Sequence, residues 1–383
     1  MSIATITAPM RRLGDITRVR TGKLDANAQR PGGPYPFFTC GEETLEIDHY
    51  AFDTEAVLLA GNGNFNAKWY RGKFNAYQRT YVIEPVGVHG KWLFYAVQAA
   101  LRRITSGNRG SVIRFIRLGD IVDSTVSVPS VDEQRRIVAE IEKQFTRLEA
   151  GVAALRRVQA NLHRYRAAVL KAACEGRLVP TETGKWRKVS LAQLGKWCGG
   201  GTPSKSNPKF WTNGKIPWVS PKDMKVPVIV DAEDHITKEA VENSATNLLP
   251  KGSVLVVTRS GILQHTLPVA VCAREVAINQ DLKALQPSAD FSSRYVAVAL
   301  KGHEQEILQT CTKTGTTVQN IEFPVFMRFE IDAPPVAEQE RIVAEVERRL
   351  SVVEELSALV ESNLKRATRL RQAVLQRAFT GEL

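Results

Sequence analysis

The sequence predicts a mixed α/β protein in which two strand-rich domains alternate with two long helices, giving an internal pseudo-two-fold repeat. Two observations support this prediction. A long stretch with helical periodicity occurs twice, and the larger segments that precede its two copies resemble each other and contain short β-branched runs. We therefore divide the chain into a first domain (1–129), a first helix (130–179), a second domain (180–334) and a second helix (335–383).

The helical repeat is the clearest signal. VDEQRRIVAEIE begins at Val131 and VAEQERIVAEVE begins at Val336, and the same separation pairs Ala168-Val169-Leu170 with Ala373-Val374-Leu375 near the far ends. In both copies apolar residues recur every three or four positions, which is typical of an amphipathic helix with a coiled-coil seam. Each helix would be about 60 Å long.

Local signals support the predicted helix ends. Ser130 and Glu133 can form a reciprocal capping box, Pro334 is tolerated just before the second helix, and Gly176 and Gly381 lie near the two ends. A helix with one apolar stripe needs a partner, and the other copy is the obvious candidate. Periodicity alone leaves parallel and antiparallel packing open. Judged on the helices alone, a generic dimerising coiled coil is an equally good interpretation.

The two larger segments are distant copies of each other. The separation between matching residues grows along the chain, which indicates insertions in the second copy. A separation of 181 positions pairs Leu13-Gly14 with Leu194-Gly195, Thr21 with Thr202, Gly33 with Gly214 and Pro36-Phe37 with Pro217-Trp218; later, the run Val57 to Leu59 matches Val254 to Val257, and a separation of 202 pairs Gln78 with Gln280 and Pro85 with Pro287.

Within these segments, strands are expected in β-branched runs bounded by Gly, Asn and Pro, and helices in longer apolar stretches. The expected strands cover Thr80 to Ile83, Val112 to Ile116, Val254 to Thr258 and Val269 to Val271, and the expected helices cover Lys91 to Arg103 and Arg294 to Gln309.

The composition favours a soluble protein with a polyanionic partner. The 383 residues include 52 Lys and Arg against 40 Asp and Glu, a net charge of +12, which favours nucleic acid through counterion release from phosphates. No apolar run approaches the roughly 20 residues that span a bilayer, and the first residues contain no run typical of a signal peptide. The five cysteines lack zinc-type spacing. We therefore expect a cytoplasmic protein without a metal site.

The order of domains and helices, together with specific phrases, resembles the specificity subunits of type I restriction-modification systems. The resemblance covers the whole chain, and it is specific in the helices and looser in the larger segments. The phrases in the helices are a proline followed by Glu-Gln-x-Arg-Ile (Pro129 with Glu133 to Ile137, and Pro334 with Glu338 to Ile342) and the ends Gly176-Arg177-Leu178 and Gly381-Glu382-Leu383; those in the larger segments are Tyr35 to Phe38, and Gly201 to Ser204 leading to Ile216 to Trp218.

The resemblance implies a function. Each larger segment would be a target recognition domain that reads one half of a bipartite, asymmetric DNA site, and the helices would pack antiparallel as a spacer between the halves. The helices would also dock two modification subunits, which bring S-adenosylmethionine and methylate adenine, while restriction subunits that use ATP and Mg would translocate and cleave DNA. The chain itself would hold no cofactor. Four residues inserted after Gln144 would then add about 6 Å and lengthen the DNA spacer by roughly two base pairs.

The residues expected to contact DNA lie in Gly-rich and basic loops. Between Val57 and Leu118 there are ten Lys and Arg but one acid, Glu84, whereas the acidic run from Glu42 to Asp53 is expected to face away from DNA. Lys, Arg, Asn and Gln contact phosphates and read base edges. For any one of these residues a solvated loop is a reasonable alternative. The candidates are Asn62, Asn64, Asn66, Lys68, Tyr70, Arg71, Lys73, Gln78, Arg79, Asn108 and Arg109 in the first domain, and Thr202, Ser204, Lys205, Lys209, Trp211, Lys222, Arg259, Ser260, Lys313 and Thr314 in the second.

Enzymatic interpretations are weaker. The segment from Gly199 resembles a phosphate-binding loop only faintly, because Ser204 stands where a glycine must precede the lysine. Asn207 to Phe210 departs at Lys209 from the Asn-Pro-Pro-Tyr motif of amino-methyltransferases, and no glycine fingerprint for S-adenosylmethionine accompanies it. Two alternatives to a DNA reader stay open, a coiled-coil scaffold that binds proteins and ignores DNA, and a metal-dependent nuclease or nickase.

Overall fold

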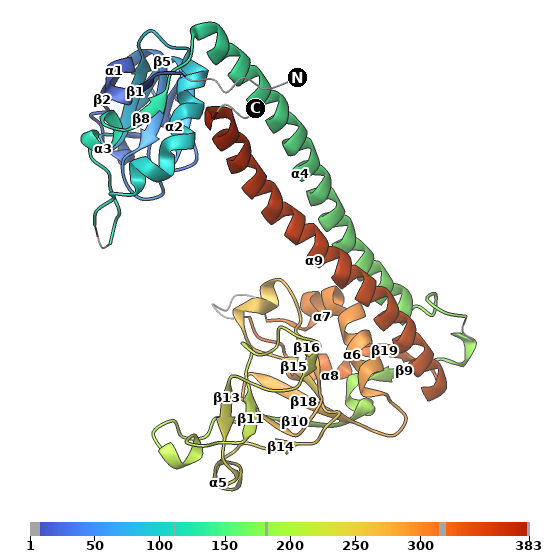
Figure 1. The fold of residues 1–383 in the computed structure, drawn as a ribbon. Helices are drawn as coiled ribbons and strands as arrows, with labels where there is room; N and C mark the ends of the chain where they lie inside the picture. Colours follow the sequence, from blue (N-terminus) through green and yellow to red (C-terminus); the bar gives the residue numbers. More distant parts are fainter. Residues whose placement is uncertain (1–7, 111, 181–182, 314–318, 381–383) are drawn as a thin grey trace. The chain divides into compact units, whose positions relative to one another are not determined.

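The computed structural model describes residues 8–110, 112–180, 183–313 and 319–380, which form two compact units. Unit 1 comprises Met1–Arg157 and Val360–Leu383, and unit 2 comprises Val158–Leu359. Each unit holds one mixed α/β domain and one half of each long helix (Figure 1). The boundary between the units therefore runs through both helices.

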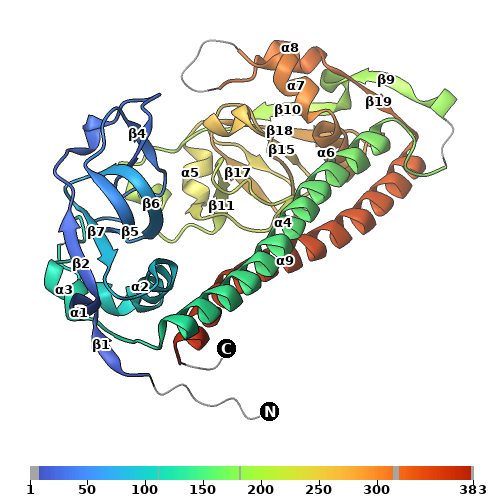
Figure 2. The ribbon, with the colours of Figure 1, turned by 90° about the horizontal axis from the view of Figure 1, so that it is seen from above.

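The long helices are α4 (Val131–Cys174) and α9 (Val336–Thr380), and they lie side by side in opposite directions (Figures 1 and 2). In unit 1 a guanidinium nitrogen of Arg371 lies 3.1 Å from a carboxylate oxygen of Glu149. In unit 2 Arg166 and Glu354 lie 3.6 Å apart in the same way. Because the residue numbers rise along α4 as they fall along α9, the packing is antiparallel, as the resemblance implied.

The ends of α4 have the expected local chemistry. The N–H of Glu133 donates to Oγ of Ser130 at 3.4 Å, which is one half of the expected capping box. At the other end Gly176 has a positive φ of 66°, and the next N–H, that of Arg177, returns to the carbonyl of Ala172 at 2.9 Å. The second expected terminal glycine, Gly381, lies outside the described residues.

The domain of unit 1 is built on a six-stranded sheet, with strand order β2-β7-β5-β6-β3-β4. A separate pair, β1-β8, brings the start of the domain beside the segment that leads into α4. The elements are β1 (Met10–Arg12), α1 (Leu13–Ile16), β2 (Thr17–Thr21), η1 (Ala26–Ala28), β3 (Tyr35–Phe38), β4 (Leu45–Ile47), β5 (Phe52–Ala60), β6 (Ala67–Ala76), β7 (Thr80–Pro85), α2 (Gly90–Thr105), α3 (Leu118–Val122) and β8 (Thr125–Ser127).

In the domain of unit 2 the corresponding strands form two sheets, a five-stranded sheet of order β10-β18-β15-β16-β12 and a four-stranded sheet of order β13-β11-β17-β14. The first and last strands of the domain, β9 and β19, form a separate pair. Its elements are η2 (Thr183–Lys185), β9 (Arg187–Ser190), η3 (Leu191–Leu194), β10 (Gly195–Gly199), η4 (Pro208–Phe210), β11 (Ile216–Val219), β12 (Val228–Ile229), β13 (Asp234–Ile236), α5 (Lys238–Glu242), β14 (Leu248–Leu249), β15 (Val254–Val257), η5 (Gly261–Gln264), β16 (Val269–Cys272), β17 (Val276–Ile278), β18 (Leu282–Pro287), α6 (Ser293–Gly302), α7 (Glu304–Cys311), α8 (Phe323–Arg328) and β19 (Glu330–Ala333).

Strand register shows that the two domains are copies. Phe37 of β3 lies beside Asn75 in a parallel pair, and Trp218 of β11 lies beside Ala277 in the same way. Thr17 faces Pro85, and its counterpart Gly195 faces Pro287. The long strand β6 of unit 1 corresponds to two shorter strands, β16 and β17, which explains why one sheet becomes two.

This register corrects one part of the expected alignment. Leu13 corresponds to Leu191, because each begins a short helical turn and donates its N–H to the segment before the last strand, to Ser124 and Phe329 respectively. The pairing of Leu13-Gly14 with Leu194-Gly195 was therefore wrong by three positions, and Thr21 corresponds to Gly199 rather than Thr202. Matching dipeptides were misleading here because Leu13 begins its helical turn whereas Leu194 ends the corresponding one.

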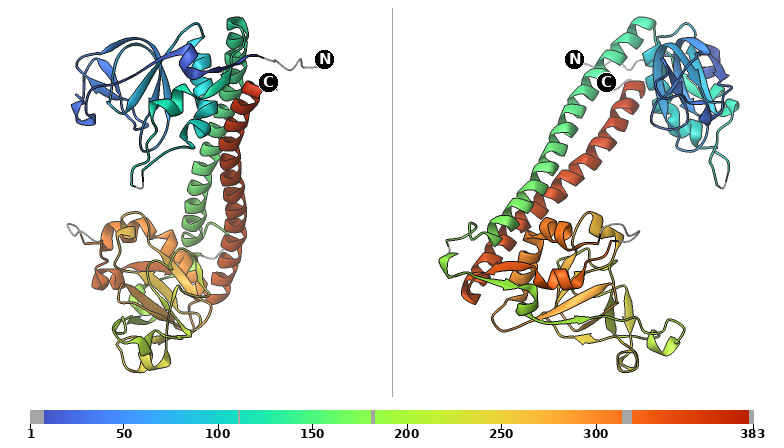
Figure 3. Two further views of the ribbon diagram at one scale, coloured as in Figure 1. Left: turned by 60° about the vertical axis from the view of Figure 1, so that its left-hand side comes forward. Right: turned by 180° about the vertical axis from the view of Figure 1, so that it is seen from behind.

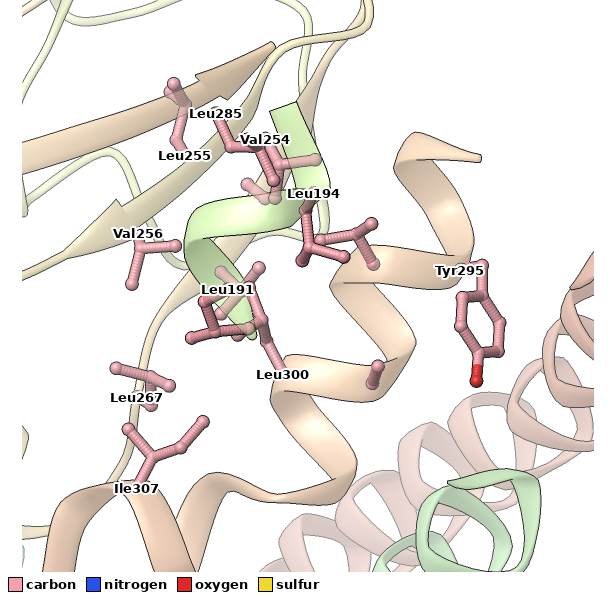
Figure 4. Packing of buried hydrophobic residues seen from close by; sticks show 14 of the residues in the cluster. Leu191, Leu194, Val254, Leu255, Val256, Leu267, Leu285, Tyr295, Leu300 and Ile307 are labelled. Atoms are coloured by element: carbon pink, nitrogen blue, oxygen red, sulfur yellow. The ribbon is translucent and has the colours of Figure 1, made fainter. Parts of the chain in front are cut away.

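One helix in each domain joins it to both long helices. In unit 1, α2 shares a buried cluster with Ile141 and Phe145 of α4 and with Leu375 of α9. In unit 2, α6 shares a buried cluster with Ala173 of α4 and Val346 of α9. Figure 4 shows the domain side of the second cluster, where Leu191, Leu194, Leu300 and Ile307 gather beside α6. Each domain is thus anchored to the beginning of one long helix and the end of the other.

Two expected elements were wrong. Val112 to Ile116 is not a strand, and Val112 and Ile113 are 92% and 59% exposed. The expected helix from Arg294 to Gln309 is two helices, α6 and α7, which separate after Gly302. Gly302 packs so closely on α4 that a Cβ there would lie 2.2 Å from Sγ of Cys174, so tertiary packing fixes the break.

The glutamine of the repeated Glu-Gln phrase is buried in both units. Oε1 of Gln134 accepts the N–H of His89, which precedes α2, and Oε1 of Gln339 accepts the N–H of Ser292, which precedes α6, both at 2.8 Å. Nε2 of Gln339 also donates to the carbonyls of Asp290 and Pro334, both at 2.9 Å. One side chain therefore joins the start of the domain helix to the start of the long helix.

Replacing Gln339 with alanine is expected to lower the free energy of unfolding of the chain by about 2–4 kcal/mol, because the N–H of Ser292 and two carbonyls lose their buried partner. Urea unfolding followed by circular dichroism measures the effect. Gln305→Ala, on the exposed face of α7, is the matched control. Equal unfolding midpoints for the two variants would contradict this role.

Candidate nucleic-acid interface

Three loops of unit 1 meet at one edge of the sheet. The N–H of Gly61, after β5, donates to the carbonyl of Arg79 at 2.8 Å, and the N–H of Gly63 donates to the carbonyl of Arg114, also at 2.8 Å. The N–H of Ile116 returns to the carbonyl of Gly61 at 3.0 Å. We call the joined segments 61–66, 77–79, 106–110 and 112–117 loop edge 1; the described residues between α2 and α3 project from it (Figure 3).

The same frame is present in unit 2. The N–H of Thr258 donates to the carbonyl of Asp281 at 2.8 Å, and the N–H of Ser260 donates to the carbonyl of Gln319 at 3.1 Å. The N–H of Ile321 returns to the carbonyl of Thr258 at 2.8 Å. The joined segments 258–268, 279–281, 312–313 and 319–321 form loop edge 2. Thus the backbone bonds of the two edges match one for one, although their side chains differ.

Seven of the eleven candidates of the first domain lie on loop edge 1. Asn66 is held in place, since its Nδ2 donates to the carbonyl of Cys40 at 2.9 Å. Arg109 is paired with Asp120, with 2.9 Å between Nη1 and Oδ2. The candidates that the structure brings to this edge are Asn62, Asn64, Asn66, Gln78, Arg79, Asn108 and Arg109, and Asn64, Gln78, Arg79 and Arg109 are exposed.

The candidates on β6 have more structural roles. Tyr70 packs against Phe38 and Phe74, with ring centroids 5.3 and 5.8 Å away. The ammonium of Lys73 lies 4.7 Å from the ring centroid of Tyr50. Arg71 is exposed and faces Glu55 across the sheet. Tyr70 therefore belongs to the core, while Arg71 and Lys73 are accessible at the surface.

The acidic segment lies beside some of these residues. Nζ of Lys68 donates to the carbonyls of Gly41 and Glu43 at 2.8 and 3.0 Å, and its partial burial lowers its pKa. Nδ2 of Asn64 lies 3.3 Å from a carboxylate oxygen of Glu42. Glu42 and Glu43 therefore lie beside two of the candidates, Asn64 and Lys68.

In the second domain, Arg259, Ser260 and Lys313 lie on loop edge 2, and Thr202 is joined to it by a hydrogen bond to Gln280. Nε of Arg259 lies 3.3 Å from a carboxylate oxygen of Asp281. Oγ of Ser260 accepts the N–H of Ile262 at 3.4 Å. Thr314 lies outside the described residues.

The other candidates of the second domain surround the four-stranded sheet. The ring of Trp211 stands edge-on to Trp218 at 5.2 Å, and its Nε1 donates to the carbonyl of Ser204 at 3.1 Å. Ser204, Lys205 and Lys209 are exposed. Nζ of Lys222 pairs with Glu233 and Asp234, and the hydrogen bond to Asp234 raises its pKa. Lys222 is thus a charged residue already paired within the domain.

Two basic residues of loop edge 1 were not among the candidates predicted from the sequence. Arg114 and Arg117 are exposed, and Arg114 supplies the carbonyl that holds Gly63. Both lie in the basic stretch that the composition indicated, but the wrongly expected strand at Val112 to Ile116 hid them. In unit 2 the corresponding residue to Arg114 is Gln319, so the two edges differ in charge at this position.

The described residues hold no group of three or more His, Cys, Asp or Glu that could bind a metal ion. Burial raises the pKa of Cys174 and Cys272 to about 12, so these thiols are protonated at neutral pH and are poor nucleophiles. No helix in the described ranges is long and apolar enough to cross a membrane.

A comparison with protein families decides the class. The family model for the type I restriction modification DNA specificity domain matches residues 7–154 and 183–361, which is most of the chain. The chain belongs to this family. Specificity subunits are the DNA-sequence-recognition components of type I restriction-modification systems and are not catalytic, so the scaffold and nuclease interpretations are set aside.

Curated relatives agree with this assignment. The specificity subunit of type I restriction enzyme EcoDI of Escherichia coli is 31% identical over 399 residues, covering 97% of this chain and 87% of the relative. The EcoR124I/EcoR124II specificity subunit of the same species is 36% identical over 242 residues, covering 62% and 56%. The match to the first relative extends over both domains and both helices of this specificity subunit.

Solved structures share its fold. A chain from a type I restriction-modification system superposes with a TM-score of 0.75 at 19% identity, covering 99% of both chains. The HsdS subunit of Thermoanaerobacter tengcongensis superposes with a TM-score of 0.58 at 18% identity, covering 99% and 98%. The two α/β domains and two long helices of this specificity subunit thus form a fold that is shared with these solved chains.

Proposed function

We propose that this specificity subunit reads a bipartite, asymmetric DNA site, one half with each loop edge. The observation that supports the proposal is that the same three backbone hydrogen bonds frame both loop edges, while the side chains on them differ. Asn62 of loop edge 1 occupies the place of Arg259 in loop edge 2, since each forms a bridge to the loop that follows the domain helices. Asn suits the N6/N7 edge of adenine and Arg the O6/N7 edge of guanine.

A second position has opposite charge in the two edges. The backbone carbonyl of Arg79 accepts the N–H of Gly61, and that of Asp281 accepts the N–H of Thr258, so the two residues are equivalent. The side chain of Arg79 is a cation, whereas that of Asp281 is a carboxylate. A carboxylate accepts a hydrogen bond from the amino group of cytosine, whereas an arginine favours guanine or phosphate. Two readers built this way would recognise unlike half-sites.

The complex that we propose contains two modification subunits, which use S-adenosylmethionine to methylate adenine in the half-sites, and restriction subunits, which use ATP and Mg to translocate and cleave DNA. The antiparallel helices would act as the spacer between the half-sites and as a docking surface. We expect this complex to work in the cytoplasm. Methylome sequencing of cells that express the subunit with its modification partner tests the proposal, and a split methylated sequence is the expected result.

Arg114→Ala is expected to reduce the salt dependence of DNA binding by the assembled complex. Neutralising one phosphate contact lowers the slope of log K against log salt by about 1, without changing which sequence is preferred. Titration by fluorescence anisotropy at several salt concentrations measures the slope. Arg18→Ala, an exposed cation on the outer strand β2, is the control; equal slopes for both variants would remove Arg114 from the interface.

A further inference from the structure

Unit 2 contains a groove of about 980 Å³ between α6, β16 and both long helices. Its floor is apolar, with Leu170 of α4, Val271 of β16, Val298 of α6 and Leu350 of α9. Its rim carries charged residues, among them Arg166 and Arg294. Every residue that lines it belongs to the same unit.

The internal repeat gives the unit 1 counterparts of Val271, Val298 and Leu350. Val254 lies between Leu285 and Val271 on its two neighbouring strands, and Val57 lies between Ile83 and Trp69 in the same way. Val271 is therefore the counterpart of Trp69. The helix α6 begins after Ser292 and α2 begins after His89, and the N–H of each of these residues is bound by the glutamine of the repeated phrase. Counting from these two residues, Val298 is the counterpart of Tyr95. The helical repeat makes Leu350 the counterpart of Phe145.

In unit 1 these positions hold aromatic rings. Nε1 of Trp69 donates to Glu55 at 2.9 Å, and the rings of Tyr95 and Phe145 meet edge to face at 5.8 Å. Two cations complete the packing, since the ammonium of Lys91 lies 5.3 Å from the ring centroid of Trp69 and the guanidinium of Arg371 lies 4.1 Å from that of Phe145. The place of Glu55 is taken in unit 2 by Gly252, which also lines the groove.

The charged rim is retained in unit 2, whereas the rings are not. Arg294 pairs with Glu347 at 3.4 Å, as Lys91 pairs with Glu142 at 2.6 Å. Arg166 pairs with Glu354, as Arg371 pairs with Glu149. Arg294 and Arg166 of unit 2 are therefore the counterparts of the two cations that lie over aromatic rings in unit 1. In unit 2 the walls beside them are apolar but hold no aromatic ring at the corresponding positions. Such walls with guanidinium groups at the rim complement the face of an aromatic ring.

We propose that this groove receives an aromatic side chain of a modification subunit, which docks on unit 2 through it. The proposal rests on the proposed function, which supplies that partner. The two docking positions on the specificity subunit are then unlike. In unit 1 the subunit fills the pocket with its own Trp69, Tyr95 and Phe145, and in unit 2 the partner fills it. A buried aromatic anchor in a preformed pocket is typical of interface hot spots.

The test fills the groove by copying unit 1, with the double variant Val271→Trp and Val298→Tyr. We expect the variant to fold with a melting temperature no lower than that of the wild type, because unit 1 already accommodates these rings. We expect it to bind one modification subunit normally and the second about thirtyfold more weakly or not at all. Native mass spectrometry of the mixture gives the stoichiometry, and Leu350→Phe provides a smaller change of the same kind.

Val86→Trp, which adds a ring at an exposed position of unit 1, is the control and should bind two modification subunits. Unchanged binding of two subunits by a folded double variant would overturn the proposal. A wild-type chain that dimerises by itself, with a monomeric double variant, would show that a second copy fills the groove and would also overturn it. Failure of the wild type to bind any modification subunit would contradict the proposed function, and the groove proposal with it.

Discussion

Exchanging residues 1–129 for the corresponding segment of another specificity subunit is expected to change one half of the methylated DNA site completely and leave the other half intact. The physical reason is that loop edge 1 is built entirely within this segment, by backbone hydrogen bonds among residues 61–66, 77–79, 106–110 and 112–117. Loop edge 2 has its own equivalent bonds in unit 2 and shares none of them. Methylome sequencing of cells that contain the modification subunit reads both halves at once.

The structure defines which donor segments are suitable. The new α2 must place apolar residues against Ile141, Phe145 and Leu375, and its first N–H must reach Gln134. A donor with these features keeps the anchor, so that only the loops differ. The control is the wild-type segment 1–129 rejoined to the rest of the chain at the same junction. Methylation in which both halves change together would show that the readers are not independent.

A seven-residue insertion in both long helices is expected to lengthen the DNA spacer by about three base pairs while both half-sites stay the same. Seven helical residues add roughly 10 Å, and they keep the apolar seam in phase. The insertion points are after Arg157 in α4 and after Ser362 in α9, which are the same place in the two copies of the repeat. Both lie between the ion pairs Glu149–Arg371 and Arg166–Glu354.

Insertion into one helix only is the matched control. An antiparallel pair with an unmatched insertion cannot keep both ion pairs, so methylation should be lost and the melting temperature should fall. The position after Gln144, which the sequence suggested, is unsuitable because Phe145 is buried against Tyr95 and Arg371. An unchanged spacer in a folded protein with the paired insertion would refute the spacer role of the helices.

Local patterns predicted the long helices well because a stripe of apolar residues over more than ten turns leaves no other structure for those residues. The loops were predicted less well. The run Val112 to Ile116 has the composition of a strand, yet it pairs with no sheet and exposes Val112. Its conformation comes from the bonds that Arg109 and Phe115 exchange and from the bonds of Arg114 with Gly63 and of Ile116 with Gly61. The last two join residues that are far apart in the sequence.

The candidate DNA-contacting residues show the same limit. Composition identified a basic, Gly-rich stretch, but it could not separate Arg79, which is exposed on loop edge 1, from Tyr70, whose ring packs on Phe38 and Phe74. Both have residue types that contact DNA. The register of β6 with β5 and β3 places the ring of Tyr70 against these two phenylalanines, whereas Arg79 lies in the turn between β6 and β7.

The sequence by itself determined the two long helices and the internal repeat, because repeated motifs and periodicity are properties of the chain alone. It indicated the class of protein through the resemblance of its phrases to a known family. Tertiary structure decided the antiparallel sense of the helices, the role of Gln134 and Gln339, and the convergence of three loops on each edge. It also decided that unit 1 fills with Trp69, Tyr95 and Phe145 a pocket that unit 2 leaves open. Each of these features depends on contacts between distant residues, which a linear pattern does not specify.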